Sequence, residues 1–187
     1  MSPIAADLPR SRRSEATAIR RLGAADRDLL LAHLLRLDAP SRRSRFAGLV
    51  SDEGVARYVE GALTAGDATF GLFADGTLRG VAELRTASGD VAEGAFSLER
   101  EWQGRGFGHQ LFEALLEAAR RRGTRRLVLQ CLRENAAMQR IARRFAGRLD
   151  FEDGEVVAVI HPPLAAEAAA SRALVRLAAE TGVTLDV

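Results

Sequence analysis

Lysine is absent from this sequence of 187 residues, so all 27 of its basic residues are arginines. They nearly balance 25 acidic residues, and a formal net charge of +2 does not predict binding to nucleic acid. Aromatic residues are also scarce, at 5% of the chain, and they form no stacking platform between the arginine clusters. A nucleic-acid-binding protein is therefore the least favoured class.

Cysteines, long apolar runs and metal-ligand patterns are equally lacking. Cys131 is the only cysteine, which excludes an intramolecular disulfide and gives no sign of an oxidising compartment. No stretch reaches the length of a membrane span, and the first residues lack the apolar run of a signal peptide. His33 and His161 show no metal-binding spacing with cysteine or acidic residues. We therefore expect a cytoplasmic protein that needs neither a metal ion nor a membrane.

The chain has the pattern of one domain with two appendages. Residues 1–14 are small, polar and basic, which predicts a flexible N-terminal tail. Residues 15–161 alternate strand and helix patterns and are long enough to bury one core. Residues 162–187 predict a C-terminal helical extension, whose apolar stripe could cover a sheet edge, close a cleft or join two subunits of a homodimer.

The expected fold class is α+β, with a mixed, mostly antiparallel sheet flanked by helices. Strands are expected at residues 16–22, 67–74, 78–86, 91–99, 126–132, 148–151 and 156–160, and helices at 26–38, 51–63, 107–122 and 135–146. Asp26 and Ser51 are the expected N-caps of the first two helices, and Pro40 should end the first. Short turns between the second, third and fourth strands imply an antiparallel meander. The apolar run LVLQCL predicts a fifth strand buried on both faces.

Three glycines stand in the segment GRGFG, between the fourth strand and the helix expected at 107–122. The first amides of a helix have no internal partners and lie at the positive end of its dipole, so such a junction can bind phosphate. A purely structural turn is an equally good reading of GRGFG taken by itself. The nucleotide P-loop is excluded because it requires a lysine, and the pattern G-x-G-x-x-G fails because His109 replaces its third glycine.

Two motifs in order carry a family resemblance. LEREWQGRGFGHQL contains Gln103-x-x-Gly106-x-Gly108, and LVLQCLRENAAMQRIARRFAG follows with Asn135, the only asparagine of the chain. Residues 17–161 thereby resemble the GNAT superfamily of acyl-CoA-dependent N-acyltransferases. The segment AEGAFSLEREWQGRGFG is similar to bacterial Pat-type protein-lysine acetyltransferase domains and their single-domain relatives. The resemblance implies a sheet splayed open between its fourth and fifth strands, with the thioester arm of the cofactor in the gap.

The resemblance also implies acetyl-CoA as co-substrate and an amine, on a protein lysine or a small molecule, as acceptor. The motif positions implied to bind the cofactor are Gln103, Gly104, Arg105, Gly106, Phe107, Gly108, His109 and Asn135, with Phe96 and Leu98 beside the pantetheine arm. The main-chain amides from Gly104 to His109 would hold the pyrophosphate.

Catalytic roles follow from the same resemblance. Glu93 matches the glutamate that acts as general base, and the backbone N–H of Leu98 would stabilise the tetrahedral oxyanion. A solvated strand residue is the alternative reading of Glu93. Strand alternation places Glu93 and Ser97 on the face opposite Phe96 and Leu98. Weaker candidates for the base are Glu83, Glu99 and Glu101.

One position departs from the family. Many members carry a tyrosine that serves as general acid where this chain has Ala142. The thiolate could leave unassisted or with water, since its pKa is only about 8.5, or another group could donate the proton. The departure leaves a non-catalytic acyl-CoA-binding sensor or regulatory module as the alternative function. Cys131 is expected to be a buried structural thiol rather than a nucleophile.

Overall fold

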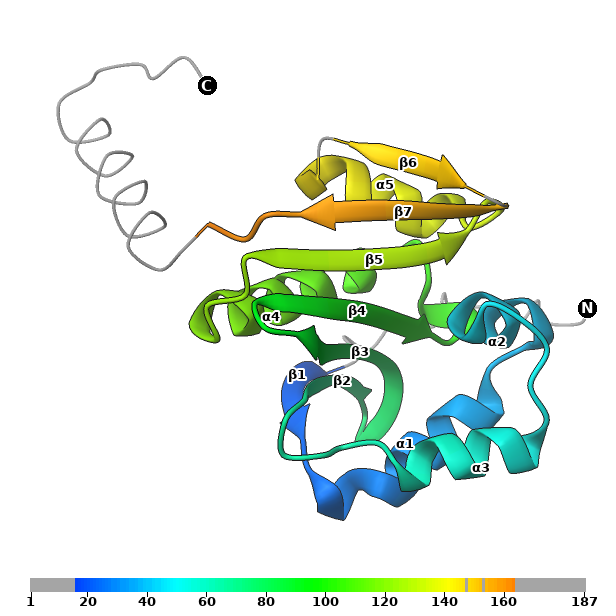
Figure 1. The fold of residues 1–187 in the computed structure, drawn as a ribbon. Helices are drawn as coiled ribbons and strands as arrows, with labels where there is room; N and C mark the ends of the chain where they lie inside the picture. Colours follow the sequence, from blue (N-terminus) through cyan, green and yellow to red (C-terminus); the bar gives the residue numbers. More distant parts are fainter. Residues whose placement is uncertain (1–15, 147, 153, 164–187) are drawn as a thin grey trace, which may run out of the picture.

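The computed structural model describes residues 16–146, 148–152 and 154–163, and a sheet of seven strands forms its centre (Figure 1). The strands lie in the order β1-β2-β3-β4-β5-β7-β6. Their bounds are Thr17–Leu22 (β1), Ala68–Ala74 (β2), Thr77–Ser88 (β3), Val91–Leu98 (β4), Arg126–Leu132 (β5), Leu149–Glu152 (β6) and Glu155–Ile160 (β7). Only β4 and β5 pair in parallel, and all other neighbours are antiparallel. The predicted class and meander are confirmed, whereas the tail over 1–14 and the helix expected after residue 163 lie outside the described residues.

Helices cover the two faces of this sheet. On one face lie α1 (Arg27–Arg36), α2 (Ala39–Phe46) and α3 (Asp52–Glu60), and on the other lie α4 (Phe107–Arg121) and α5 (Ala136–Ala146), which are behind the sheet in Figure 1. Two short 3-10 turns, Ala24–Asp26 and Arg100–Trp102, precede α1 and follow β4.

Each face has its own hydrophobic core. Alternation along β3 sends Leu84 toward α4 and Val81 toward α1 and α3, so this one strand contributes to both cores. Phe112 and Leu115 of α4 are completely buried in the larger core. Removing a side chain of this size from a filled core typically costs about 3–5 kcal/mol, so α4 is fixed firmly against the sheet.

Two of the helices over the first face, α2 and α3, begin at side-chain caps, which are Asp38 and Ser51. The hydroxyl of Ser51 accepts from the backbone N–H of Gly54, as predicted for α3. Asp26 stands at the N-cap position of α1, as predicted, but its side chain makes no capping hydrogen bond, because its carboxylate accepts from Arg20 and from the N–H of Gly23. Pro40 does separate the first helix from the next, but it does so inside the first turn of α2, where a missing N–H is tolerated.

The expectation that β5 is buried on both faces was also wrong. Leu127, Leu129 and Cys131 are buried under α4 and α5, but Val128 is half-buried and Gln130 is exposed. The reason is that the second face of β5 is covered only in part, by α2. The second face of β5 is therefore open to solvent at Gln130.

Candidate active site

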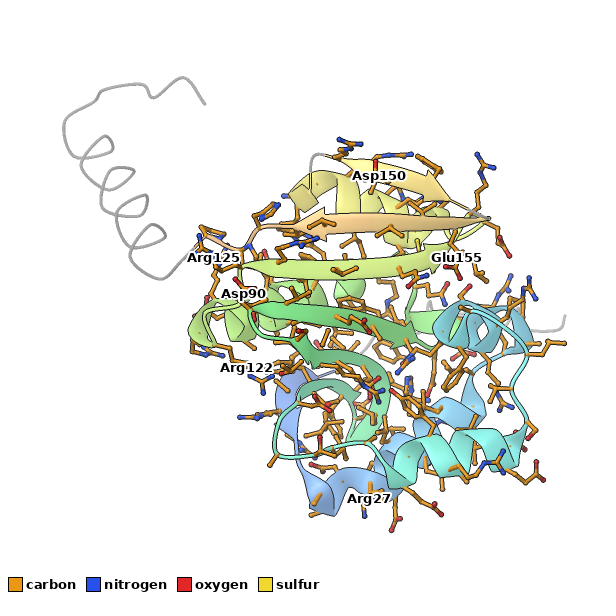
Figure 2. The ribbon with its side chains drawn as sticks, in the orientation of Figure 1. Arg27, Asp90, Arg122, Arg125, Asp150 and Glu155 are labelled. Atoms are coloured by element: carbon orange, nitrogen blue, oxygen red, sulfur yellow. The ribbon has the colours of Figure 1, made fainter. Side chains whose placement is uncertain are left out.

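The parallel pairing of β4 with β5 stops in the middle of both strands. The register runs from Val91↔Arg126 to Gly94↔Leu129, yet β4 continues to Leu98 and β5 to Leu132. The sheet therefore forks between residues 95–98 and 130–132, which confirms the predicted splay. Figure 2 labels Asp90 and Arg125 at the closed end, and Glu155 beside the end of β5 at the open end.

Glycine fits the closed end of this fork. A Cβ at Gly94 would lie 2.6 Å from Cδ2 of Leu129, so the two strands touch just before they part. Beyond Gly94, β5 keeps its antiparallel pairing with β7 as far as Leu132↔Glu155. On one side of the fork β5 is held by its pairing with β7, and on the other side β4 is held by its pairing with β3.

The direction of the β4 amides at the fork follows from one hydrogen bond. The backbone N–H of Glu99 donates to the carbonyl of Arg79 in the β3 direction, at 3.0 Å. Because successive amides of a strand point to opposite sides, the N–H groups of Phe96 and Leu98 point away from β3, toward the fork. Both lie beyond the last pair with β5. The structure therefore presents two main-chain donors to the open gap, including the predicted one on Leu98.

The glycine loop follows at the open end of the fork. Gly104 and Gly106 have φ of +71° and +87°, a left-handed conformation that is strained for residues with a Cβ. Gly106 is the N-cap of α4 and offers no side chain, and no acidic residue stands in the first turn. The amides of Phe107 and Gly108 are therefore available to an anion, whereas the amide of His109 donates to the carbonyl of Gly106 at 3.1 Å.

Aromatic and aliphatic contacts hold this loop in place. Trp102 is buried and its ring lies 5.5 Å from that of Phe107, while the guanidinium of Arg105 lies 4.5 Å above the Trp102 ring. At Gly108 a Cβ would lie 3.3 Å from Cδ1 of Ile141, so α4 and α5 approach closely there. The ring of His109 stacks on that of Phe145 of α5, with the ring centroids 5.2 Å apart.

Asn135 lies where β5 leads into α5. Its Oδ1 accepts from the backbone N–H of Met138, so this residue is the N-cap of α5. Parallel strands end at the same edge, and the asparagine and the glycine loop therefore follow neighbouring strand ends. Ala142, further along α5, is 2% exposed and packs in the larger core, and its methyl group carries no proton to donate.

The predicted base, Glu93, is exposed and stands opposite Arg85 in the register of β3 and β4. Glu101 is exposed as well, in the turn after β4. Glu83, in contrast, is 2% exposed, and its carboxylate accepts from the guanidinium of Arg45 and the hydroxyl of Tyr58. The charge of Glu83 is thus balanced by the buried guanidinium of Arg45, and both its partners occupy the carboxylate, which makes Glu83 a poor candidate for the catalytic base.

Glu99 is held as an anion. Burial opposes its charge, but hydrogen bonds from His33, Arg79 and Arg36 outweigh burial and lower its pKa to about 2. A carboxylate with so low a pKa is a weak base, so this candidate is also disfavoured. Its oxygens nevertheless orient His33, whose Nδ1 lies 3.3 Å from Oε1 of Glu99.

His33 is the residue that sequence reasoning missed. It is completely buried on α1, and its Nε2 lies 2.9 Å from Oγ of Ser97 on β4. Burial lowers the pKa of His33, against the raising effect of Glu99, so the ring is neutral. The available signal was the position of His33 on the same helical stripe as Leu30 and Leu34, because a buried histidine requires partners.

Cys131 is buried, as predicted, and burial raises the pKa of its thiol. That shift disfavours the thiolate and hence a role as nucleophile. Within residues 16–146, 148–152 and 154–163, no three potential ligands gather for a metal ion. No helix in this part of the chain combines the length and hydropathy needed to cross a bilayer.

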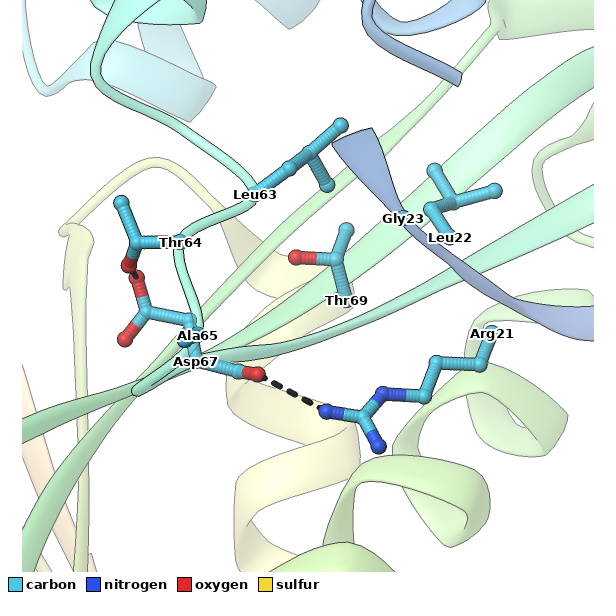
Figure 3. A pocket seen from close by; sticks show the side chains of 8 residues that line it. All are labelled: Arg21, Leu22, Gly23, Leu63, Thr64, Ala65, Asp67 and Thr69. Atoms are coloured by element: carbon cyan, nitrogen blue, oxygen red, sulfur yellow. Dashed lines mark hydrogen bonds between the residues drawn. The ribbon is translucent and has the colours of Figure 1, made fainter. Parts of the chain in front are cut away.

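Two surface pockets lie outside the fork. Figure 3 shows one of about 400 Å³ at the β1–β2 edge, where Arg21 donates to the carbonyl of Asp67. The other, of about 330 Å³, surrounds the end of α2 near Leu49. Neither includes a residue of β4, β5 or the glycine loop, so neither adds to the site.

Sequence comparison identifies the family. The profile of the acetyltransferase (GNAT) family matches residues 33–147, which span α2 through α5 and include β4, the glycine loop and β5. A comparison with curated proteins finds no match.

Solved structures share the fold. The GNAT domain of PAT from S. lividans is 24% identical, with a TM-score of 0.65 over 79% of this chain and 96% of that domain. The PaiA N-acetyltransferase of Thermoplasma acidophilum, solved with coenzyme A, is 20% identical, with a TM-score of 0.58 over 78% and 99%. The ribosomal-protein-S18-alanine N-acetyltransferase of Escherichia coli is 18% identical, with a TM-score of 0.59 over 80% and 96%. Because these sequence identities are all below 25%, the matches show a shared fold alone.

Proposed function

The chain belongs to the acetyltransferase (GNAT) family, and from this premise we propose that it moves an acetyl group from acetyl-CoA to an amine by direct attack in a ternary complex. The observation that carries the proposal is the fork in the sheet, where the amides of Phe96 and Leu98 face an unpaired gap. The glycine loop begins at the open end of that gap. A cofactor with a diphosphate and a long thioester arm would use both features at once.

The residues present fit coenzyme A. The main-chain amides of the segment from Gly104 to His109 would hold the diphosphate, helped by the dipole of α4. The amides up to Gly108 would contribute most, because that of His109 already donates to the carbonyl of Gly106. Gln103 donates to the carbonyl of Leu98, so the loop is fastened to the strand along which the pantetheine arm would lie. The side-chain oxygen of Asn135 caps α5, and its side-chain N–H groups would donate to the cofactor.

The two fork amides would stabilise the transition state. Attack on the thioester places a negative charge on the carbonyl oxygen, and donors already in place lower the energy of that charge without reorganisation. Leu98 is the proposed principal donor and Phe96 its neighbour along the pantetheine arm. Because the donor at each position is a main-chain N–H, the side chain takes no part in the reaction. The apolar residues Phe96 and Leu98 can therefore stand at catalytic positions.

Glu93 is the proposed base for the incoming ammonium. A lysine-type ammonium has a pKa near ~10.4 and must lose a proton before it attacks. Along a strand the rise is ~3.3 Å per residue, so Glu93 lies roughly 10 Å from Phe96 and roughly 16 Å from Leu98. Glu93 would therefore remove the proton through water, as the acceptor enters, rather than by direct contact at the thioester.

A non-catalytic acyl-CoA sensor is the second candidate. It is favoured by Ala142, which is buried where a general acid stands in many family members. The two functions share the cofactor site and differ only in turnover. The acceptor of the enzyme would be an amine, carried by a protein lysine, a protein N-terminus or a small molecule.

Release of free CoA thiol from acetyl-CoA, measured with a panel of amines and lysine peptides, tests the proposal. We expect turnover with at least one acceptor and a loss of roughly 100-fold in Glu93→Gln, the size typical of a general base. Glu60→Gln, which changes an exposed carboxylate at the end of α3, is the matched control and should keep full activity. Tight binding of acetyl-CoA without turnover across the panel would instead support the sensor.

A further inference from the structure

A buried hydrogen-bonded chain reaches β4 beside the fork. It runs from Glu99 through His33 to Ser97, with distances of 3.3 Å from the Glu99 carboxylate to Nδ1 and 2.9 Å from Nε2 to the Ser97 hydroxyl. His33 is completely buried, and Ser97 and Glu99 are 6% and 9% exposed. A histidine between a carboxylate and a hydroxyl is the arrangement that serves proton transfer in hydrolases.

The ionisation of Glu99 fixes the direction of both hydrogen bonds made by His33. Glu99 also accepts from Arg36 and Arg79 and is ionised, so it can only accept. His33 must therefore carry its proton on Nδ1 and donate it to Glu99. The neutral ring then has a lone pair on Nε2, and the hydroxyl of Ser97 donates to it. Ser97 is left with lone pairs that can accept a proton from another group.

The position of Ser97 sets it apart from Glu93. Ser97 immediately precedes Leu98, the proposed oxyanion donor, and their Cα atoms lie only ~3.8 Å apart. Glu93 is five residues away on the same strand, roughly 16 Å along β4. Of the titratable or hydroxyl side chains of β4, which are those of Glu93 and Ser97, Ser97 is therefore the nearer along the strand to the proposed oxyanion donor.

We propose that Ser97 transfers the second proton of the acceptor amine to the departing CoA thiolate, and that His33 and Glu99 are the positioning residues of this relay. The proposal rests on the acetyl transfer proposed above and adds the group that delivers the final proton. The relay also supplies a proton donor to a protein in which Ala142, at the usual position of the general acid, cannot donate one.

The step balances in atoms and charge. When the neutral amine attacks, the C–N bond forms and the nitrogen becomes a cation with one proton to lose. Ser97 accepts that proton as its own proton moves to Nε2 of His33, and the ionised Glu99 stabilises the imidazolium. The C–S bond then breaks, Ser97 gives a proton to the thiolate, and His33 returns its proton to Ser97. The products are the N-acetylated amine and CoA thiol, and all three side chains regain their first state.

The surroundings keep His33 neutral between turnovers. Burial lowers its pKa, and so do the charges of Arg36 on α1 and Arg45 on α2, whereas Glu99 acts in the opposite sense. Arg79 of β3 faces Glu99 rather than the ring. An imidazolium in this environment is unstable and gives its proton back, which suits a group that holds a proton only while the C–S bond breaks.

The test uses the full chain with acetyl-CoA and any acceptor that the wild type accepts. Ser97→Ala should lower kcat by about 100-fold or more, the range for proton transfer, while KM for acetyl-CoA changes less than about 3-fold. Ser97→Thr keeps a hydroxyl and should restore most of the rate. His33→Gln should lower kcat by a similar factor without changing KM. Thermal melting and acetyl-CoA affinity confirm that each variant is folded.

The pH dependence separates this relay from Glu93. The deficit of Glu93→Gln should shrink as the pH rises from 7 to 9, because more acceptor arrives already deprotonated. The deficit of Ser97→Ala should persist over this range, since the proton it handles appears only after attack. Folded Ser97→Ala with the kcat of the wild type would overturn the relay alone. A wild type that binds acetyl-CoA but acetylates no acceptor would overturn the proposed function and the relay together.

Discussion

The side-chain amide of Gln103 donates to the main-chain carbonyl of Leu98 at 2.9 Å. The first residue of the glycine motif is thereby fastened to the last residue of β4, and a second bond, of 3.0 Å, joins the same nitrogen to the hydroxyl of Ser41 on α2. The loop that would hold the diphosphate and the strand that would hold the thioester are thus one connected unit.

We predict that Gln103→Ala weakens acetyl-CoA binding by about 3- to 10-fold. The reason is that a hydrogen bond of this kind contributes about 0.5–1.5 kcal/mol, and its loss frees the loop from β4. Isothermal titration with acetyl-CoA measures the change, with the melting temperature as control. An affinity equal to that of the wild type would show that the two parts are positioned independently of this bond.

A second prediction concerns Gly106. A Cβ there would meet nothing within 4 Å, so Gly106→Ala is strained only by its φ of +87°, at a cost of about 1–2 kcal/mol. Because relief of that strain moves the first amides of α4, we expect cofactor affinity to fall more than stability. Gly66→Ala, at a glycine with neither a positive φ nor a close neighbour, is the matched control and should change neither.

A third prediction concerns the buried pair of Arg45 and Glu83. Their side chains are 7% and 3% exposed, so removing one partner leaves the other charged inside the protein. Arg45→Met should lower the free energy of unfolding by about 3–5 kcal/mol, and adding Glu83→Leu should restore part of it. Urea unfolding measures both. Asp52→Asn, which removes the 70% exposed carboxylate of the pair with Arg42, should cost at most about 1 kcal/mol, and equal costs at the two pairs would contradict the assignment.

A fourth prediction concerns stability in acid. Glu99 has a pKa lowered to about 2 from 4.5, so the folded state binds fewer protons and its contribution is lost as the pH falls through this window. The contribution is about 3 kcal/mol at neutral pH. His33, with a pKa lowered from 6.5, acts in the same direction at higher pH. Glu99→Gln should therefore flatten the fall in unfolding free energy between pH 4.5 and 2, and an unchanged slope would contradict the role of Glu99.

The sequence predicted the parts of the fold that depend on local signals. The meander follows from short turns such as the one at Asp75 and Gly76, both of which have positive φ. The glycine loop and the following helix were equally readable, because Gly104 and Gly106 adopt a conformation that other residues avoid. The fork was predicted only from the family resemblance, since no local pattern shows where two parallel strands separate.

The polar chain beside the fork could not be predicted in the same way. His33 and Ser97 are 64 residues apart, and His33 and Glu99 are 66 apart, so only the packing of α1 on the sheet brings them together. Arg45 and Glu83 are likewise joined across 38 residues. The sequence also predicted too much burial for β5. The extent to which α2 covers this strand depends on tertiary packing, which no local pattern reveals.

Diffraction from crystals grown with acetyl-CoA tests the central claim most directly. The account predicts the diphosphate on the main-chain amides of residues 104–109 and the thioester oxygen within about 3 Å of the N–H of Leu98 or Phe96. Cofactor density elsewhere on the molecule, with the fork and the glycine loop bare, would contradict it.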